Sequence, residues 1–434
     1  MQKFIYLFIT VQIIVFNHSP AFCETLYSLH DIALLANKQS ETIKIAKEEV
    51  FIAKQDKQRA LSVMMPRATA YGAMTKYKEE DFAAPDTLTM GVKLTQSFTI
   101  NGKELIAYNV TKNIIEGKEF SLEAIRSQYL LQVAQAYFNI LSAQRFFEIA
   151  QSDVKRLTTY KDAVKEKLIV GNVTKTDLYR AKAELSKAMT EHVKTENIVL
   201  QAKALLQNLV EIDENFNLKK NDIIKNSDLK FSLDEIQTYA LKNRPEIKEA
   251  NNNLEVARKT IKFNKSDYWP ELSLEAGYKE TDIEYDSFPN NIRYDTEDVY
   301  FSGELVFTLY DGGLRKAQIK QAVADFRKAK NALSLQKKQI ILEAKVNFLD
   351  NKAAQSALLN LQDELKSARE NFNAVTMQFK YGMADSINIM DANTLLVSAQ
   401  RRISDAEYIH YLSILKILYT KGELNKFLLD GKSS

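Results

Sequence analysis

Histidine, cysteine and paired acidic side chains do most of the catalysis and metal binding in proteins, and this chain arranges few of them for either task. Beyond the first 24 residues its histidines are His30, His192 and His410, which are far apart and form no HExxH or similar metal-binding spacing. The sequence has no GxSxG, P-loop or GxGxxG motif, and Asp311, Gly312 and Gly313 are interpreted as a strand-to-helix turn. We therefore expect a protein that is not an enzyme and uses neither a metal nor a cofactor.

The composition predicts a folded, exported protein. Of 434 residues, 45% are apolar, and the net charge is only +3 with basic residues spread along the chain, so no nucleic-acid partner is expected. The apolar run Phe4–Phe16 is shorter than the ~20 residues that span a bilayer as a helix. It fits the core of a signal peptide at 1–23, cut before Glu24, although Cys23 leaves lipidation as an alternative.

The chain is predicted to be a tandem duplication. "YSLHDIALLANKQSETIKIA" from Tyr27 matches "FSLDEIQTYALKNRPEIKEA" from Phe231 at an offset of 231 − 27 = 204. Further along, at an offset of 211 (313 − 102 and 382 − 171), two pairs of glycines match: Gly102 with Gly313, and Gly171 with Gly382. We therefore divide the chain into a first repeat at 24–210, a linker or equatorial segment at 211–230, and a second repeat at 231–434.

Each repeat is expected to contain one very long helical hairpin, at 103–210 and at 314–428. The first arm of each hairpin has no proline, almost no glycine and much Ala, Leu, Lys, Glu and Gln. At ~1.5 Å per residue such an arm is about 100 Å long. Gly171 and Gly382 follow these arms, where a left-handed residue commonly ends a helix, so we place the hairpin tips there. The second returning helix is predicted to run unbroken over 385–428.

Strands of period two are predicted at about 67–77, 88–100, 271–280 and 298–310. Strands of this length with one polar and one apolar face are typical of transmembrane β-barrels. The polar face, with Lys93, Thr95, Glu304 and Thr308, is expected to line water. The apolar face is expected to meet lipid through these side chains: Leu88, Met90, Val92, Leu94, Phe98, Val299, Phe301, Leu305, Phe307 and Leu309. Because four strands cannot close a barrel, the chain must oligomerise.

The duplicated pattern, the "SLxxIxxxA" openings and the "G…D…A" hairpin tips resemble the TolC-like outer-membrane efflux proteins, over nearly the whole chain from about Tyr27 to Leu428. The resemblance implies a mainly α fold with transmembrane strands, a homotrimer, and a 12-stranded barrel continued by a periplasmic α-barrel. It also implies a passive exit duct for efflux or type I secretion. Such a duct is coupled through a periplasmic adaptor, also called a membrane fusion protein, to an inner-membrane pump.

The resemblance also implies a pore constriction and a lock at the second tip. The family's two constricting Asp residues correspond to Asn388 and Asp391 here, so three chains would form a ring of three Asp391 carboxylates that favours cations; the alternative is a solvated helix residue. Phe379 and Ala384 stand where the family has a locking Tyr and Arg. The lock's acceptor side is matched in the first tip by two residues: Thr176 and Asp177. The closed state must therefore be held differently, with Asp385 or Lys175 as candidates.

Two further expectations concern the tips. Arg180 is the pseudo-equivalent of Asp391 (180 + 211 = 391), so a pair between them could partly neutralise the ring. The adaptor is expected to dock on the turn residues, Val170, Gly171, Asn172, Val173, Tyr381, Gly382 and Met383, with Ala384 beside them. A periplasmic coiled-coil adaptor or structural protein remains the alternative function. The alternation at 88–100 and 299–310 favours the channel, and drug, metal or polypeptide all remain possible cargo.

Overall fold

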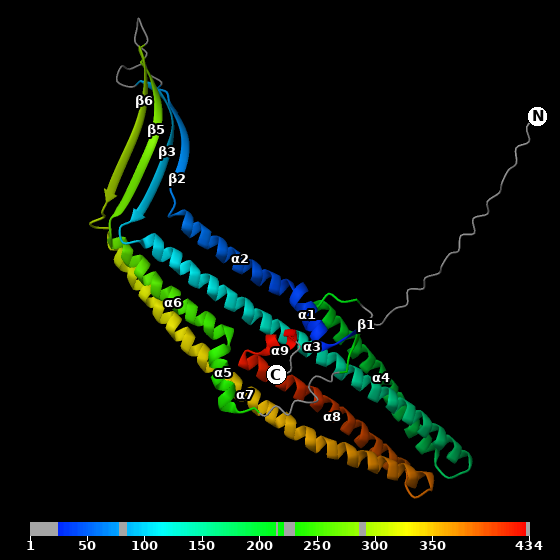
Figure 1. Cartoon of the computed structure of the whole chain (residues 1–434). Helices are drawn as coiled ribbons and strands as arrows, with labels where there is room; N and C mark the ends of the chain where they lie inside the picture. Colours follow the sequence, from blue (N-terminus) through cyan, green and yellow to red (C-terminus); the bar gives the residue numbers. More distant parts are fainter. Residues whose placement is uncertain (1–24, 78–84, 214–215, 221–230, 286–291, 431–434) are drawn as a thin grey trace, which may run out of the picture.

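The computed structural model describes residues 25–77, 85–213, 216–220, 231–285 and 292–430, so the predicted signal peptide lies outside the described residues. The molecule is elongated (Figure 1). A sheet lies at one end, the tips of two helical hairpins lie at the other, and short elements lie at mid-length. It is mostly helical with two repeats of the same element order, which confirms the predicted fold class of one chain. Among the described residues, no helix is both long and apolar enough to cross a membrane.

The first repeat contains four helices and two long strands: α1 (Leu29–Gln39), α2 (Glu41–Ser62), β2 (Arg67–Thr75), β3 (Asp86–Thr99), α3 (Lys103–Ile169) and α4 (Lys175–Leu209). The second repeat has the same order, followed by a terminal helix: α5 (Leu233–Asn243), α6 (Pro245–Lys265), the 3₁₀ turn η1 (Ser266–Tyr268), β5 (Glu271–Tyr285), β6 (Ile292–Val306), α7 (Leu314–Lys380), α8 (Ser386–Lys421) and α9 (Leu424–Asp430). Helices α3 and α7 each have 67 residues, because no proline interrupts them.

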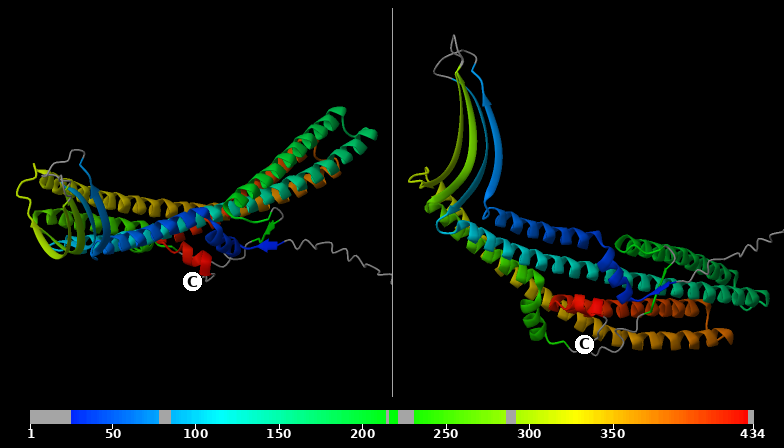
Figure 2. Two further views of the ribbon diagram at one scale, coloured as in Figure 1. Left: turned by 90° about the horizontal axis from the view of Figure 1, so that it is seen from above. Right: turned by 45° about the horizontal axis from the view of Figure 1, so that its top comes forward.

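The four long strands form one antiparallel sheet in the order β2-β3-β5-β6, and the sheet curves (Figure 2). The last strand was expected at 298–310, but β6 runs from Ile292 to Val306. The reason is its partner: β5 begins at Glu271, opposite Val306, so no residue of β5 pairs with 307–310, although the alternation of side chains continues there. In the other direction β5 continues to Tyr285, opposite Ile292, through residues that were expected to form a loop.

The returning helix of the second repeat is shorter than predicted. It was expected to continue to Leu428, but α8 ends at Lys421 and a separate helix, α9, follows. Gly422 ends α8 in the left-handed conformation (φ 77°), with the Glu423 amide donating to the Leu418 carbonyl at 2.9 Å. A Cβ at Gly422 would lie 3.2 Å from the Asn243 backbone, so this turn also packs tightly against the end of α5.

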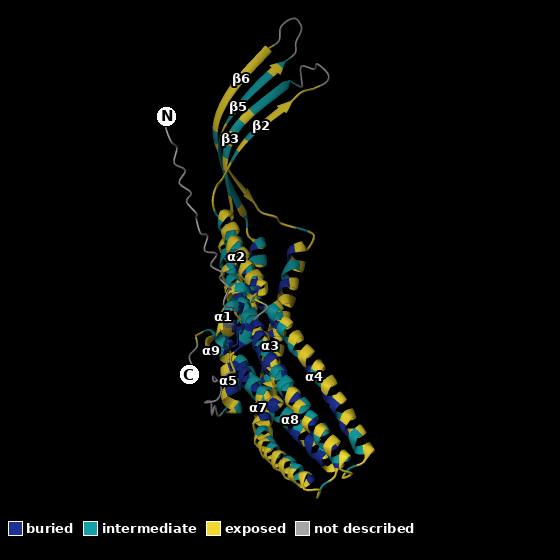
Figure 3. Cartoon of the chain, turned by 90° about the vertical axis from the view of Figure 1, so that its right-hand side faces the viewer, coloured by how far each residue is buried: buried dark blue, intermediate teal, exposed yellow. Residues whose placement is uncertain are grey.

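The linker between the repeats is partly structured, which the sequence analysis did not predict. Strand β4 (Phe216–Leu218) pairs in parallel with β1 (Thr25–Tyr27) near the beginning of the described chain. Phe216 and Leu218 are buried in the central core, and this core also contains Tyr137, whose hydroxyl donates to the Lys219 carbonyl at 2.6 Å. Buried residues are concentrated at this mid-length region and become sparser toward the sheet (Figure 3).

A buried arginine joins the second repeat's short and long helices. Arg244, between α5 and α6, is 4% exposed and contacts the carboxylates of Glu246 at 2.8 Å and Glu343 of α7 at 3.0 Å. Its guanidinium also lies 4.4 Å above the ring of Tyr419 in α8. Burial opposes the charge of Arg244, but the two carboxylates outweigh burial and raise its pKa. This cluster fixes α5 and α6 against the hairpin of α7 and α8.

Candidate functional site

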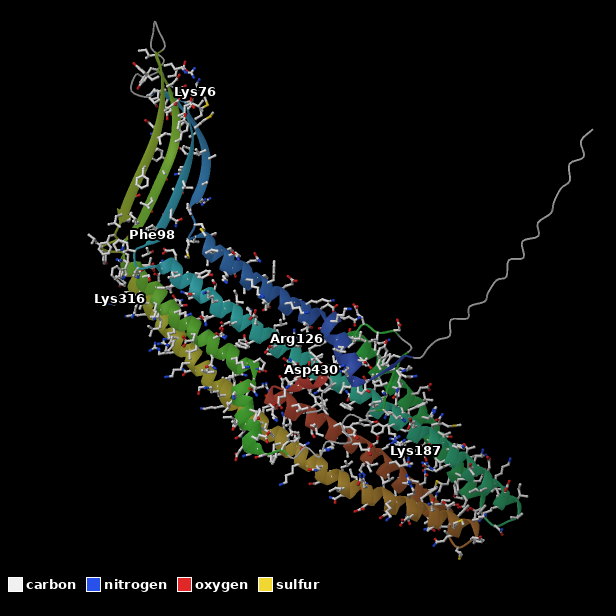
Figure 4. The ribbon with its side chains drawn as sticks, viewed as in Figure 1. Lys76, Phe98, Arg126, Lys187, Lys316 and Asp430 are labelled. Carbon is white, nitrogen blue, oxygen red and sulfur yellow. The ribbon has the colours of Figure 1, made fainter. Side chains whose placement is uncertain are left out.

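One face of the four-stranded sheet presents an apolar band. Pairing between strands aligns Leu94 with Ala276 and Phe301, and two residues away it aligns Val92 with Tyr278 and Val299. Phe301 and Val299 are 74% and 86% exposed. A third row lies nearer the helices: Phe98, Leu272 and Leu305. Phe98 marks that end of the sheet, while Lys76 lies at the far end (Figure 4). Between the rows of Leu94 and Phe98 lies a row that begins with the polar Gln96, followed by Leu274 and Gly303. The strands therefore expose mostly apolar rows on a single face.

The apolar band ends before the far end of the sheet. Met90 pairs with Glu280, which pairs with Glu297, and Leu88 is aligned in the same way with Asp282 and Asp295. The predicted lipid-facing residues Leu88 and Met90 therefore share their rows with pairs of carboxylates. At the opposite end, two more predicted lipid-facing side chains lie beyond β6 and are exposed: Phe307 and Leu309. The structure thus brings the central predicted residues together and places these four at the margins.

The opposite face of the sheet is polar. Lys93 contacts the Glu275 carboxylate at 3.0 Å, and the Tyr300 hydroxyl donates to the same carboxylate at 2.8 Å. Thr95 donates to the Arg67 carbonyl on β2. Two further pairs of hydroxyl groups cross between β3 and β5 on this face: Thr89 with Thr281, and Ser97 with Ser273. The two faces therefore differ as a wall between lipid and water requires.

At each hairpin tip, a glycine in the left-handed conformation follows the end of the first helix. Gly171 has φ 77° and Gly382 has φ 78°. Residues with a Cβ adopt this left-handed conformation only at a cost in free energy. In each turn an amide bonds back to the carbonyl five residues earlier, at 2.9 Å for Asn172 and 2.8 Å for Met383. The repeat thus encodes the same turn twice, 211 residues apart (382 − 171 = 211).

The returning helices α4 and α8 each begin with a capping box. In α4, Asp177 accepts hydrogen bonds from the hydroxyl and amide of Thr174, and these bonds lower the pKa of its carboxyl. In α8, Asp385 accepts from the amide of Asn388, and the Asn388 side-chain oxygen accepts from the Asp385 amide at 3.1 Å. Asp177 and Asn388, expected in the lock and the constriction, therefore also cap helices, and Thr176 beside Asp177 is exposed.

Asp391 lies six residues after Asp385, the N-cap of α8, and is exposed. The neighbouring Ala392 and Asn393 are buried, so Asp391 faces away from the packed side of α8. Arg180, its pseudo-equivalent on α4, is exposed as well. No ion pair joins Arg180 to Asp391 in the part of the chain that the structure describes.

Two of the expected lock residues, Phe379 and Ala384, pack into a hydrophobic tip cluster. Its buried members come from all four hairpin helices: Tyr160 and Val164 of α3, Ala181 of α4, Phe379 of α7 and Ile389 of α8. Phe379 is 5% exposed, and Ala384 is among the partly buried residues that pack against the cluster. Where the resemblance implies a lock built from a hydroxyl and a guanidinium, this chain therefore has apolar contacts between its two hairpins.

Two polar groups border the tip cluster. The Lys167 ammonium donates to the Phe379 carbonyl and lies 4.3 Å above the Phe379 ring. The rings of Tyr160 and Phe379 lie 5.3 Å apart. Burial raises the pKa of the Tyr160 phenol, an effect that the nearby Ser386 hydroxyl opposes. The hydroxyl groups of Tyr160 and Ser386 make no hydrogen bond of normal geometry with another described residue. Lys167 thus connects α3 of the first hairpin to the end of α7 in the second.

The turn residues expected to dock a partner project from the end of the molecule. Val170, Tyr381 and Met383 are 67%, 69% and 72% exposed. The other turn residues are also accessible, with Val173 half-buried against the tip cluster. Large exposed apolar side chains on two adjacent turns are a typical contact surface for another protein.

Sequence reasoning missed Tyr160, Lys167 and a polar network behind the tips. In that network the Asn393 amide donates to Asp153 at 2.8 Å, and Arg156 contacts both residues across α3 and α8. Within α3, Asp153, Arg156, Tyr160 and Lys167 are spaced by three, four and seven residues, a helical spacing that puts them along one side. The partner on α8 is 240 positions from Asp153, so no local pattern could show the contact.

Comparisons with known proteins agree with this arrangement. The sequence profile of the family described as "Outer membrane efflux protein" matches residues 53–210 and 238–413. "Outer membrane protein TolC" of Vibrio cholerae is 20% identical over 430 residues, which cover 98% of this chain and 97% of that protein. "Proteases secretion protein PrtF" of Dickeya chrysanthemi is 22% identical over 324 residues, covering 73% of this chain and 68% of that protein.

The fold is also that of a solved channel. The Campylobacter jejuni CmeC outer membrane channel superposes with a TM-score of 0.78 at 18% identity, over 91% of this chain and 86% of that one. Within the described residues, no group of three or more His, Cys, Asp or Glu is placed to hold a metal ion.

Proposed function

Since this chain belongs to the outer membrane efflux protein family, we propose which of its residues form the barrel wall, the constriction, the gate and the partner surface. The protein is a channel for efflux or secretion in the outer membrane and extends into the periplasm. The observation that supports the residue assignments best is the separation of an apolar-faced sheet at one end from paired helical turns at the other.

Three copies of the chain close the sheet. In one chain, β2 and β6 are edge strands of the four-stranded sheet. Unpaired backbone groups are very costly in hydrocarbon, so both edges require partners. Three chains supply 3 × 4 = 12 strands, with the apolar band toward lipid and the Lys93–Glu275 face toward water. Each repeat, 24–210 and 231–434, contributes two strands and one hairpin to this homotrimer.

The three copies of Asp391 form the selective constriction. Asp391 is exposed near the tip of the hairpin, six residues after the cap of α8, and no described group of its own chain neutralises it. A threefold ring of carboxylates concentrates cations at the narrow end of the tunnel. Asn388, on the same side of α8, adds an uncharged polar group, part of whose hydrogen-bonding capacity the helix cap already uses.

The tip cluster holds the gate closed. Phe379 and Ala384 replace polar lock residues with apolar contacts, and Lys167 adds a link from α3 to α7. Opening the tunnel requires the two hairpins to separate, which exposes Phe379 and Tyr160 to water and so costs free energy.

A periplasmic adaptor engages the exposed turns and couples the channel to an inner-membrane pump. Val170, Tyr381 and Met383 supply the apolar contact area. Gly171 and Gly382 allow the sharp turns that project these side chains.

Single-channel conductance in planar bilayers tests the constriction. Wild-type protein should form small cation-selective channels, and Asp391→Ala should widen them or reduce the selectivity. The matched control is Asp213→Ala, an exposed aspartate at mid-length, outside the hairpins. If both variants conduct like wild type, the constriction lies elsewhere. If well-folded protein forms no channels, the proposed assembly is wrong.

A further inference from the structure

A groove of about 680 Å³ lies between the two hairpins just behind the tips. Its walls are α3 and α7, and its apolar lining includes Tyr160, Phe372, Phe379 and Ile389. Tyr160, Phe379 and Ile389 also belong to the tip cluster, so this tip groove borders the contact that joins the hairpins. Its volume is within the range of pockets that bind small molecules.

The rim of the tip groove is cationic. Four basic side chains line it, and none of its described lining residues is acidic: the four are Lys155, Arg156, Lys167 and Lys380. Arg156 is engaged by Asp153 and Asn393, and Lys167 by the Phe379 carbonyl. Lys155 and Lys380 are exposed, and their ammonium groups have no hydrogen-bond or ion-pair partner among the described residues. Lys155 lies on α3 and Lys380 lies at the end of α7, and they leave two positive charges of the rim without a counter-charge.

The tip groove opens away from Asp391. Ile389, which lines the groove, is two residues before Asp391, and two residues turn a helix by about 200°. Asp391 is exposed on the other side of α8. If Asp391 faces the tunnel, as the proposed function has it, the groove opens to the periplasm and is reached without entering the duct.

We propose that the tip groove binds a small amphipathic anion, an aromatic or alicyclic body with one carboxylate or sulfonate group. The body packs on Phe372 and Phe379 of α7 and on Tyr160 of α3, and the anionic group lies among the basic side chains of the rim. A molecule in this position contacts both walls at once, so it holds the hairpins together and favours the closed gate. The chemistry excludes a cation, because every charged side chain of the lining is positive.

Equilibrium dialysis of the detergent-solubilised full-length protein, against micelles without protein, tests binding directly. The probe is naphthalene-2-sulfonate, compared with the neutral 2-naphthylmethanol and the cationic 2-naphthylmethylammonium. Wild-type protein should bind the sulfonate saturably, with one molecule per chain, and the other two much more weakly. Lys155→Ala/Lys380→Ala should weaken binding about tenfold, the effect expected from removing two exposed positive charges from the rim. Phe372→Ala should weaken it through the lost ring contact.

The matched control is Lys182→Ala/Lys194→Ala, which removes two exposed charges from α4 outside the groove and should leave binding unchanged. No saturable sulfonate binding, equal binding of all three probes, or equal loss in both double variants would overturn the proposal. Single-channel recordings of the same samples separate this outcome from failure of the proposed function. Channels without sulfonate binding reject only the ligand site. Folded protein without channels rejects the assembly, whatever the dialysis shows.

Discussion

Among the tip residues, Phe379 is the one whose mutation should weaken the closed state most. It is 5% exposed, packs on Tyr160 of the other hairpin and is contacted by Lys167. Phe379→Ala removes these contacts, and truncating a buried phenylalanine costs about 3–5 kcal/mol. We expect larger or longer channel openings in planar bilayers. Phe51→Ala, at an exposed position on α2, is the control. Unchanged openings in the Phe379 variant would show that the cluster does not hold the gate.

Asp177 makes the start of α4 dependent on pH. Its hydrogen bonds from Thr174 lower the pKa of its carboxyl below the ordinary value of about 3.9. The stabilisation is therefore complete above pH ~4 and is lost as the pH falls through the lowered pKa. Hydrogen exchange of peptides covering 172–182, corrected for intrinsic rates, should show the first turn of α4 losing protection in that acidic range.

Asp177→Asn is the informative control for this effect. An asparagine can accept the same capping bonds and does not titrate, so protection at 172–182 should no longer depend on pH. If the variant loses protection in acid as wild type does, another group controls the opening of this turn.

Residue-level reasoning on the sequence located the positions of the tip but not their partners. Phe379 and Ala384 were identified because they depart from the family's lock, yet their role as apolar packing depends on Tyr160, more than two hundred positions away. Asn388 and Asp177 were interpreted through the family pattern, while the capping boxes that engage both were visible as T-x-x-D and D-x-x-N.

At the scale of the sheet, Gly91 is the position where a side chain cannot be accommodated. A Cβ there would lie 2.6 Å from the Tyr278 carbonyl oxygen and 2.9 Å from the Tyr71 ring, and the backbone oxygen cannot move aside cheaply. We expect Gly91→Ala to lower the melting temperature of the detergent-purified assembly and the yield of folded protein. Gly303→Ala is the control, because its Cβ would meet only the end of Leu274 at 3.4 Å. Equal stability of both variants would mean that β3 and β5 rearrange around the methyl group.

The elements were predictable to the extent that local composition determines them. The absence of proline gave the long helices, and alternation gave the strands, because both patterns are properties of adjacent residues. Strand ends depend on pairing: 307–310 alternates like a strand but has no partner beyond Glu271. The break at Gly422 and the pairing of β1 with β4 depend on contacts with Asn243 and with residues almost two hundred positions away, which no local pattern contains.

At the scale of the whole molecule, a single chain has a sheet whose two edge strands each lack a partner on one side among the described residues. Its packed core is at mid-length, where buried residues of both repeats come together, whereas the sheet at the end exposes apolar side chains on one face and edge strands on both sides. The packed core at mid-length stabilises the chain, but the edge strands of the sheet need partner strands, which other copies can supply.

We therefore expect the detergent-purified protein to be a trimer, with a native mass about three times that of one chain once detergent is removed in the spectrometer. Twelve strands close a barrel whose hydrogen bonds are all satisfied, so the trimer should also resist dissociation by mild denaturant until the sheet itself unfolds. Gly91→Ala, which strains the sheet, should dissociate earlier, and Asp391→Ala, which does not touch the sheet, should dissociate like wild type. A monomer that keeps its full far-ultraviolet circular dichroism would contradict the closed barrel, because the edges of β2 and β6 would then be stable without partners.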